Sequence, residues 1–258
     1  MNELLAAILE ASMAGLLAGF VVFLRVGAAM AVLPAFGEQM VPARIRLVIA
    51  LGFTVITAPA VADHVAPIAA RGEVLGMFIA TEALAGLLIG LGLRLFILCL
   101  QMAGTMAAQA TSLSQIFGGM SGDPMPAVSQ LLTIAGLALA VMAGLHVKVV
   151  ELLVLSYEMM PAGRFPGAED VMTWGLGNVA RAFTLAFSLA APFVIASLIY
   201  NAALGAINRA MPQLMVAFVG APALTLGGLI LMAMALPIAL AVWARALDGW
   251  FANPFGMP

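Results

Sequence analysis

The chain has 258 residues, of which 64% are hydrophobic and only 9% are charged, and its mean hydropathy is +1.15. Soluble domains are about 45–50% apolar and about 25% charged, so this composition excludes a water-soluble enzyme. Ten Lys and Arg residues against twelve Asp and Glu residues leave no basic field for nucleic-acid phosphate, so we expect no nucleic-acid partner. The chain is therefore predicted to be an integral membrane protein in contact with membrane lipid, or a subunit buried in a membrane complex.

Apolar runs long enough to cross a membrane recur along the whole chain, since a membrane helix needs about 20 mostly apolar residues. They predict an all-α, membrane-associated protein of about six long, kinked helices arranged as helical hairpins. The predicted helices cover residues 4–33, 43–61, 73–112, 126–160, 171–209 and 213–250.

The breaks between these helices are set by proline and glycine. Pro34 and Pro42 bracket the first turn, because each proline removes a backbone donor and restricts the residue before it. Residues 62–72 are expected to form a short loop. The glycine- and proline-rich stretches 118–126 and 161–167 predict the turns that follow the third and fourth helices.

The predicted helices are too long for a simple bundle. The third, fourth and fifth would each have about 35–40 residues, or roughly 52–60 Å at 1.5 Å per residue, whereas a hydrocarbon core is about 30 Å thick. They must tilt and kink, with Pro192, Pro222 and Pro237 as natural kink points, or project into a protein environment. Backbone freed by a kink needs cover from neighbouring protein, which favours a subunit of a larger assembly.

Ionisable residues within apolar helices are functional hypotheses by default, because burying a charge is costly. Lys148 and Glu151 are three residues apart and are expected to neutralise each other, with a proton relay as the alternative. Glu82 and Arg94 are expected to pair across helices, and in a pump Glu82 would instead be the isolated carboxylate near mid-span.

The sequence predicts no enzymatic site, metal or cofactor. The lone Cys99 can form neither an intramolecular disulfide nor a thiolate cage. His64 and His146 stand without an H-E-x-x-H motif, and no G-x-S-x-G elbow, P-loop or Rossmann fingerprint is present. The acidic N-terminus lacks the positive region of a cleavable signal peptide, so we expect none.

Three stretches resemble the FliR family of flagellar biosynthetic proteins and its injectisome counterparts. Residues 203–222, ALGAINRAMPQLMVAFVGAP, are similar without a gap to the family pattern A-L-G-x-x-N-R-x-x-P-Q-L-x-x-x-x-x-G-x-P. Residues 25–46 resemble the family's Arg-started helix, Pro-led turn and V-P-x-R-hydrophobic-[RK] element, and residues 82–104 its E-x-x-x-G-x-x-x-G and A-G elements. The chain departs from the family at Gln109, which arrives early, at Ala221 in place of Phe, and around His146.

The matched positions are the ones that the resemblance assigns to the family motif and to assembly. Gly86 and Gly90 also form a G-x-x-x-G, which allows another helix to approach closely. Arg209 offers several planar donors for exposed carbonyls or a partner's carboxylate, so the polar cluster around it is assigned to assembly rather than to the channel. The full set is Arg25, Pro34, Pro42, Arg44, Arg46, Glu82, Gly86, Gly90, Asn201, Asn208, Arg209, Pro212, Gln213, Gly220 and Pro222.

The resemblance implies a core subunit of the flagellar type III protein export gate, through which unfolded flagellar proteins cross the bacterial inner (cytoplasmic) membrane in the flagellar basal body. It implies FliP-like and FliQ-like partners, FlhB-like and FlhA-like components, and unfolded export substrates in transit. It also implies one FliR-like domain over 1–258, with a FliP-like helical part at 1–200 and a FliQ-like part at 201–258. An injectisome counterpart and a small secondary transporter are the alternatives.

The stretch 114–126 corresponds by position to the family's pore-plugging loop. Its glycines would give mobility and its apolar side chains a stopper, since a hydrophobic constriction gates by excluding water. An ordinary interhelical turn is the alternative. The predicted plug residues are Ile116, Phe117, Gly118, Gly119, Met120, Gly122, Asp123 and Pro124.

Overall fold

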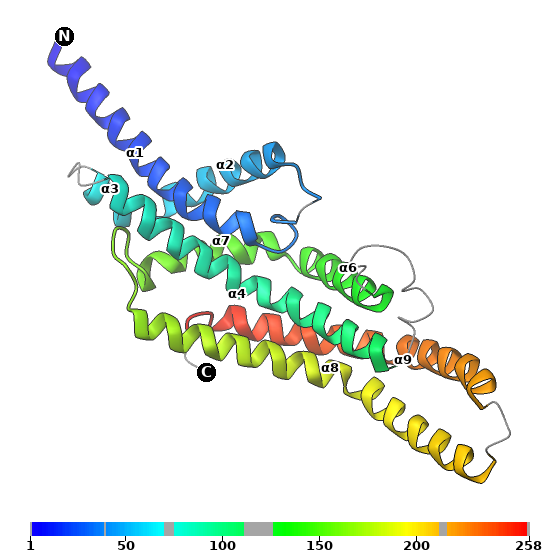
Figure 1. The fold of residues 1–258 in the computed structure, drawn as a ribbon. Helices are drawn as coiled ribbons and strands as arrows, with labels where there is room; N and C mark the ends of the chain where they lie inside the picture. The colour runs from blue at the N-terminus through cyan, green and yellow to red at the C-terminus, as the bar shows by residue number, and fades with distance from the viewer. Residues whose placement is uncertain (1, 39, 70–74, 111–125, 212–215, 257–258) are drawn as a thin grey trace. The chain divides into compact units, whose positions relative to one another are not determined.

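The computed structural model describes residues 2–38, 40–69, 75–110, 126–211 and 216–256. These residues form helices joined by turns and contain no strand, which confirms the predicted all-α class (Figure 1). The helices are α1 Asn2–Val32, α2 Ala43–Ala60, α3 Ala62–Ala69, α4 Leu75–Ala110, α6 Ala127–Met142, α7 Leu145–Met159, α8 Ala168–Ala210 and α9 Val216–Ala252.

The chain folds as two compact units. The first comprises residues 1–95, 141–178 and 251–258, and so holds α1, α2, α3, α7 and the first part of α4. The second comprises residues 96–140 and 179–250, and so holds most of α6 and α9 together with the remainders of α4 and α8. The three longest helices therefore each contribute to both units.

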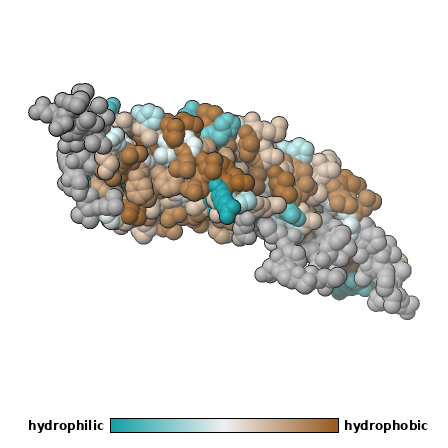
Figure 2. All heavy atoms as spheres, turned by 90° about the horizontal axis from the view of Figure 1, so that it is seen from above, coloured by the Kyte–Doolittle hydropathy of each residue, from teal (hydrophilic) through white to brown (hydrophobic). Residues whose placement is uncertain are grey.

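Five helices of the described part are long and apolar enough to cross a membrane, or up to six if α6 and α7 form one broken span. The 36 residues of α4 and the 43 of α8 correspond to about 54 and 65 Å at 1.5 Å per residue, well beyond a hydrocarbon core of about 30 Å. α8 runs through Pro192 without ending. On the face drawn in Figure 2, brown hydrophobic residues predominate among those described. The protein is a multi-pass membrane protein.

The predicted helix 126–160 is wrong as a single element. α6 ends at Met142 and α7 begins at Leu145. Between them Gly144 adopts the left-handed conformation (φ +80°), and its N–H donates to the Val141 carbonyl at 3.1 Å. Because side-chain-bearing residues rarely adopt a positive φ, glycine here ends one helix and lets the next begin in a new direction.

The predicted loop 62–72 is also wrong over most of its length, because residues 62–69 form α3. Asp63 lies in its first turn, where a negative charge favours the helix N-terminus. The non-helical stretches at 33–42 and 160–167 agree with the predicted turns among the residues described there.

The core of the second unit depends on small residues and one tryptophan. Gly104 of α4 lies so close to Ser129 of α6 that an added β-carbon would be 2.7 Å from the Ser129 nitrogen, and the Ser129 hydroxyl donates to the Gln101 carbonyl at 2.9 Å. Trp243 of α9 is 1% exposed, and its indole N–H donates to the Phe96 carbonyl at 2.9 Å. These contacts hold α6 and α9 against the second part of α4.

Candidate functional site: a buried ion pair in the first unit

The first unit encloses a fully buried ion pair between α1 and α4. The Nε of Arg25 donates to Oε2 of Glu82 at 2.8 Å, and the two side chains are 1% and 0% exposed. Removing two charges from water costs several kcal/mol per ion, and this cost is offset only when the geometry of the pair is good and its remaining polar atoms are hydrogen-bonded. The surroundings of the pair therefore decide whether it is tolerated.

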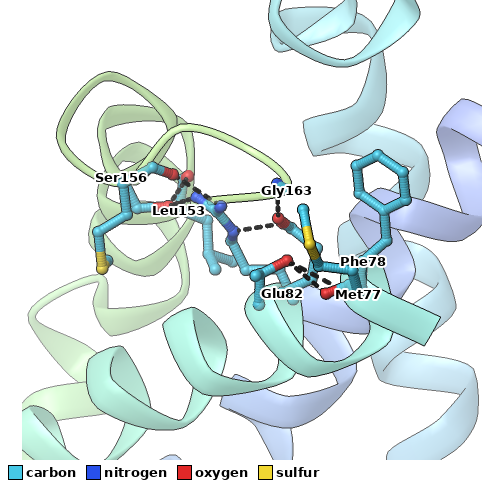
Figure 3. Close-up of polar contacts among 9 residues, drawn as sticks. Met77, Phe78, Glu82, Leu153, Ser156 and Gly163 are labelled. Atoms are coloured by element: carbon cyan, nitrogen blue, oxygen red, sulfur yellow. Dashed lines mark hydrogen bonds and ion pairs between the residues drawn. The ribbon is translucent and has the colours of Figure 1, made fainter. Parts of the chain in front are cut away.

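The other two nitrogens of the Arg25 guanidinium form hydrogen bonds to the end of α7. Nη1 donates to the Ser156 hydroxyl at 2.9 Å and Nη2 to the Met160 carbonyl at 2.8 Å. The ring of Tyr157 lies against the guanidinium, with its centroid 3.7 Å from Cζ. Ser156 in turn donates to the Leu153 carbonyl at 2.6 Å, as Figure 3 shows. Arg25 thus fixes the end of α7 to α1.

Glu82 fixes the loop that follows α7. Its Oε1 accepts the backbone N–H of Gly163 at 3.2 Å, so both carboxylate oxygens are used (Figure 3). Gly163 has φ +74°, and a β-carbon added to it would be 2.6 Å from the ring of Phe78. The loop therefore requires glycine for its conformation and for the space beside it.

The two glycines of the G-x-x-x-G lie directly against the backbone of α1. A β-carbon on Gly86 would overlap the Arg25 carbonyl, and one on Gly90 would lie 2.7 Å from the Ala29 carbonyl. Gly86 faces Arg25, and Gly90, four residues later, faces Ala29, which is also four residues later. α1 and α4 therefore run in the same direction here. The close approach brings Arg25 within reach of Glu82.

A second polar cluster holds the turn between α1 and α2. Arg94 Nη1 donates to Oε1 of Glu38 at 2.6 Å. Arg46 Nη2 donates to the carbonyls of Glu38 at 3.1 Å and Val41 at 3.4 Å. Both arginines thereby fix the turn that Pro34 and Pro42 were predicted to bracket.

Glu82 is not an isolated carboxylate, because it pairs with Arg25 of α1. The predicted pairing across helices is therefore confirmed for Glu82, whereas Arg94 pairs with Glu38 in the turn after α1, and Glu82 and Arg94 do not pair with each other. The two residues are twelve positions apart on one helix, or about 18 Å at 1.5 Å per residue, too far to form an ion pair. Lys148 lies over the ring of Phe251, 5.7 Å from its centroid, and its predicted pairing with Glu151 stays a prediction.

The structure brings together Arg25, Glu82, Gly86 and Gly90. The other predicted residues either lie elsewhere in the fold or are not described by the structure. Arg44 is exposed near the start of α2. The predicted plug, 116–124, lies outside the described residues, as do Pro212 and Gln213, and the side chains of Gly220 and Pro222 in α9 are likewise not described. Exposed side chains at the end of α8 include those of Asn201, Asn208 and Arg209.

Sequence reasoning missed Ser156, Met160 and Gly163. Ser156 was visible as a hydroxyl within an apolar run, and Gly163 as a turn glycine, but neither signal identifies a partner more than 80 residues away. Among the described residues no group of three or more His, Cys, Asp or Glu could hold a metal ion. The arrangement serves as a clamp that joins α1, α4 and α7.

Comparison with known proteins gives consistent matches along almost the whole chain. The family profile described as "Bacterial export proteins, family 1" matches residues 16–250. The "Flagellar biosynthetic protein FliR" of Caulobacter vibrioides is 37% identical over 226 residues, which cover 86% of this chain and 89% of that protein. The proteins of the same name from Escherichia coli K12 (26% identity, 83% and 82% coverage) and Bacillus subtilis 168 (27%, 78% and 79%) are also similar.

Proposed function

This chain belongs to the FliR family of bacterial export proteins, and from that membership we propose that it is a core subunit of the flagellar type III export gate. In this role it helps to form and close the channel through which unfolded flagellar proteins cross the inner membrane, within the flagellar basal body. The observation that carries the proposal is the family match over residues 16–250. The relatives described above have flagellar names, which favours the flagellar system over the injectisome.

The helices support a role within a larger assembly. α4 and α8 are longer than a bilayer requires. The end of α8 carries exposed apolar residues beside the polar Asn201, Asn208 and Arg209, with Leu198 at 69% and Ile199 at 65% exposure. Amide and guanidinium groups gain little from lipid tails, whereas a partner's carbonyls and carboxylates satisfy them. This surface is suited to FliP-like and FliQ-like partners, with FlhB-like and FlhA-like components beyond them.

The channel is closed, in this proposal, by the stretch 114–126. Its apolar residues Ile116, Phe117 and Met120 would form a constriction that excludes water, and therefore ions, while no substrate is in transit. Catalysis has no part in this role, and the energy for export comes from other components.

The experiment is purification of the tagged protein from its native host in mild detergent, with mass spectrometry of the proteins that accompany it. We expect FliP-like and FliQ-like proteins in one stable particle, and loss of motility and of flagellar protein secretion when the gene is deleted. Arg209→Ala should reduce the yield of this particle, whereas Arg181→Ala, an exposed arginine on the same helix, should not.

Two results would count against the proposal. A protein that is stable alone and is stabilised by a small solute would favour a transporter. A normal particle with lost secretion in Arg209→Ala would assign the end of α8 to the channel rather than to assembly.

A further inference from the structure

An open, shallow groove of about 340 Å³ lies between α1 and α2 in the first unit. Helix α1 contributes apolar or small residues to it, and so does α2, except for one arginine. The groove is lined by Phe23, Leu24, Gly27, Ala28, Ala43, Arg46, Leu47 and Ala50. We call it the α1–α2 groove.

Positive charge gathers at the end of the groove where α2 begins. Arg46 is the one charged residue among the eight, and its Nε is buried without a hydrogen-bond partner among the described residues, while its Nη2 is used on the turn. Arg44 is exposed two residues earlier. The nearby carboxylate of Glu38 is neutralised by Arg94, so the two α2 arginines are not balanced by it.

The rest of α2 is apolar toward its surroundings. Its 18 residues are long and apolar enough to cross a membrane, and only 17% of them are buried within the protein. The side chains of Val48, Val55 and Ile56 are 67%, 74% and 58% exposed. These three residues lie outside the groove and show that the helix beside it is exposed to apolar surroundings. The groove itself combines the apolar residues that line it with a basic end at one terminus of a membrane-length helix.

We propose that the α1–α2 groove binds an anionic phospholipid, with an acyl chain along the apolar residues and the phosphate held by Arg44 and Arg46. Basic pockets beside membrane helices recognise anionic headgroups in this way. Charge complementarity selects an anionic headgroup over a zwitterionic one, and the apolar length selects a lipid over free phosphate. The proposal concerns a lipid site and does not depend on the export role.

Gly27 provides a way to fill the groove without disturbing the fold. A β-carbon at this position would meet only the Phe23 ring, at 3.8 Å, which is an ordinary contact. Gly27→Leu should therefore be accommodated and should occupy the space of the acyl chain. Gly15→Leu on the same helix is the matched control, because nothing lies within 4 Å of a β-carbon there.

The test places the full-length protein in nanodiscs of equal parts phosphatidylglycerol and phosphatidylcholine, extracts it in mild detergent, and identifies the retained lipid by native mass spectrometry. We expect phosphatidylglycerol to be retained over phosphatidylcholine. Arg44→Gln should reduce this retention about fivefold, as expected for one basic residue at an anionic surface. Gly27→Leu should abolish it, and Gly15→Leu should leave it unchanged.

Arg44 is exposed, so Arg44→Gln remains informative even if Gly27→Leu fails to fold. Equal retention of the two lipids, or phosphatidylglycerol retention undiminished in Arg44→Gln, would overturn the proposal. A photocrosslinker at Leu24 that captures a protein segment instead of lipid would also overturn it, because the groove would then be a protein interface. Capture of phosphatidylglycerol by the same probe would support it.

Discussion

The ring of Phe78 lies so close to Gly163 that a β-carbon added to the glycine would be only 2.6 Å from it. Phe78 is on the first turn of α4 and Gly163 is in the loop after α7, so one helix limits the residue type at a turn 85 positions away. Gly163 also donates its N–H to Glu82, one helical turn after Phe78. The loop is thus held by a steric contact and a hydrogen bond from the same face of α4.

Gly163→Ala should destabilise the protein more than Gly144→Ala. Both glycines have positive φ, at +74° and +80°, but only Gly163 has a side chain in the way. A non-glycine residue in this conformation costs on the order of 1–3 kcal/mol, and Gly163→Ala must in addition displace Phe78. Thermal denaturation in detergent, with matched expression levels, measures the difference. Equal midpoints for the two variants would mean that Phe78 moves aside freely.

Removing one member of the buried ion pair should cost more than removing both. Arg25→Met leaves the carboxylate of Glu82 buried without its cation, a loss of about 3–5 kcal/mol. In Arg25→Met/Glu82→Leu no uncompensated charge remains, so part of this loss should be recovered. Denaturation curves of the unaltered protein, Arg25→Met, Glu82→Leu and the double variant give the coupling energy between the two side chains. Strictly additive losses would show that the pair is not energetically coupled.

Gly86→Ala and Gly76→Ala should change stability in opposite directions. Alanine is normally favoured over glycine within a helix, by roughly 0.5–1 kcal/mol in the interior and by less at Gly76, the second residue of α4, and nothing lies within 4 Å of a β-carbon there. At Gly86 the added methyl would overlap the Arg25 carbonyl and separate α1 from α4. Denaturation midpoints should rise slightly for Gly76→Ala and fall clearly for Gly86→Ala. A rise for both would show that α1 can shift without cost.

Deleting residues 116–122 should raise the ion leakage of the assembled complex in liposomes, because the proposed hydrophobic stopper is removed. Replacement of the same residues by a Gly/Ser segment of equal length separates the apolar character of the stretch from its length. Leakage in both variants would assign gating to the apolar side chains. If neither variant leaks more than the unaltered complex, the stretch is an interhelical turn and no plug.

Much of the fold could be predicted from the sequence, because apolar runs and proline-bracketed turns are local signals. The bounds of α2, α4 and α8 differ from the predicted ranges by three residues or fewer at each end. The break at Gly144 was missed, since a glycine in an apolar helix gives no local sign of a positive φ. The partner of Glu82 was missed because it depends on how α1 packs against Gly86 and Gly90, a tertiary contact. Ser156 is 131 positions from Arg25, beyond the reach of any spacing argument.

The partners of Arg25 in the buried ion-pair site are far from it along the chain, so they are synthesised after it in a fixed order. Arg25 precedes Glu82 by 57 residues and Met160 by 135, so at about 5–20 residues per second of synthesis its counter-ion emerges seconds later and its last partner up to tens of seconds later. An arginine at the centre of a membrane helix costs about 2.5–3.5 kcal/mol on insertion. We therefore expect α1 to enter the bilayer with the Arg25 guanidinium unpaired, because its ion pair can form only after α4 has been translated and its bonds to Ser156 and Met160 only after α7.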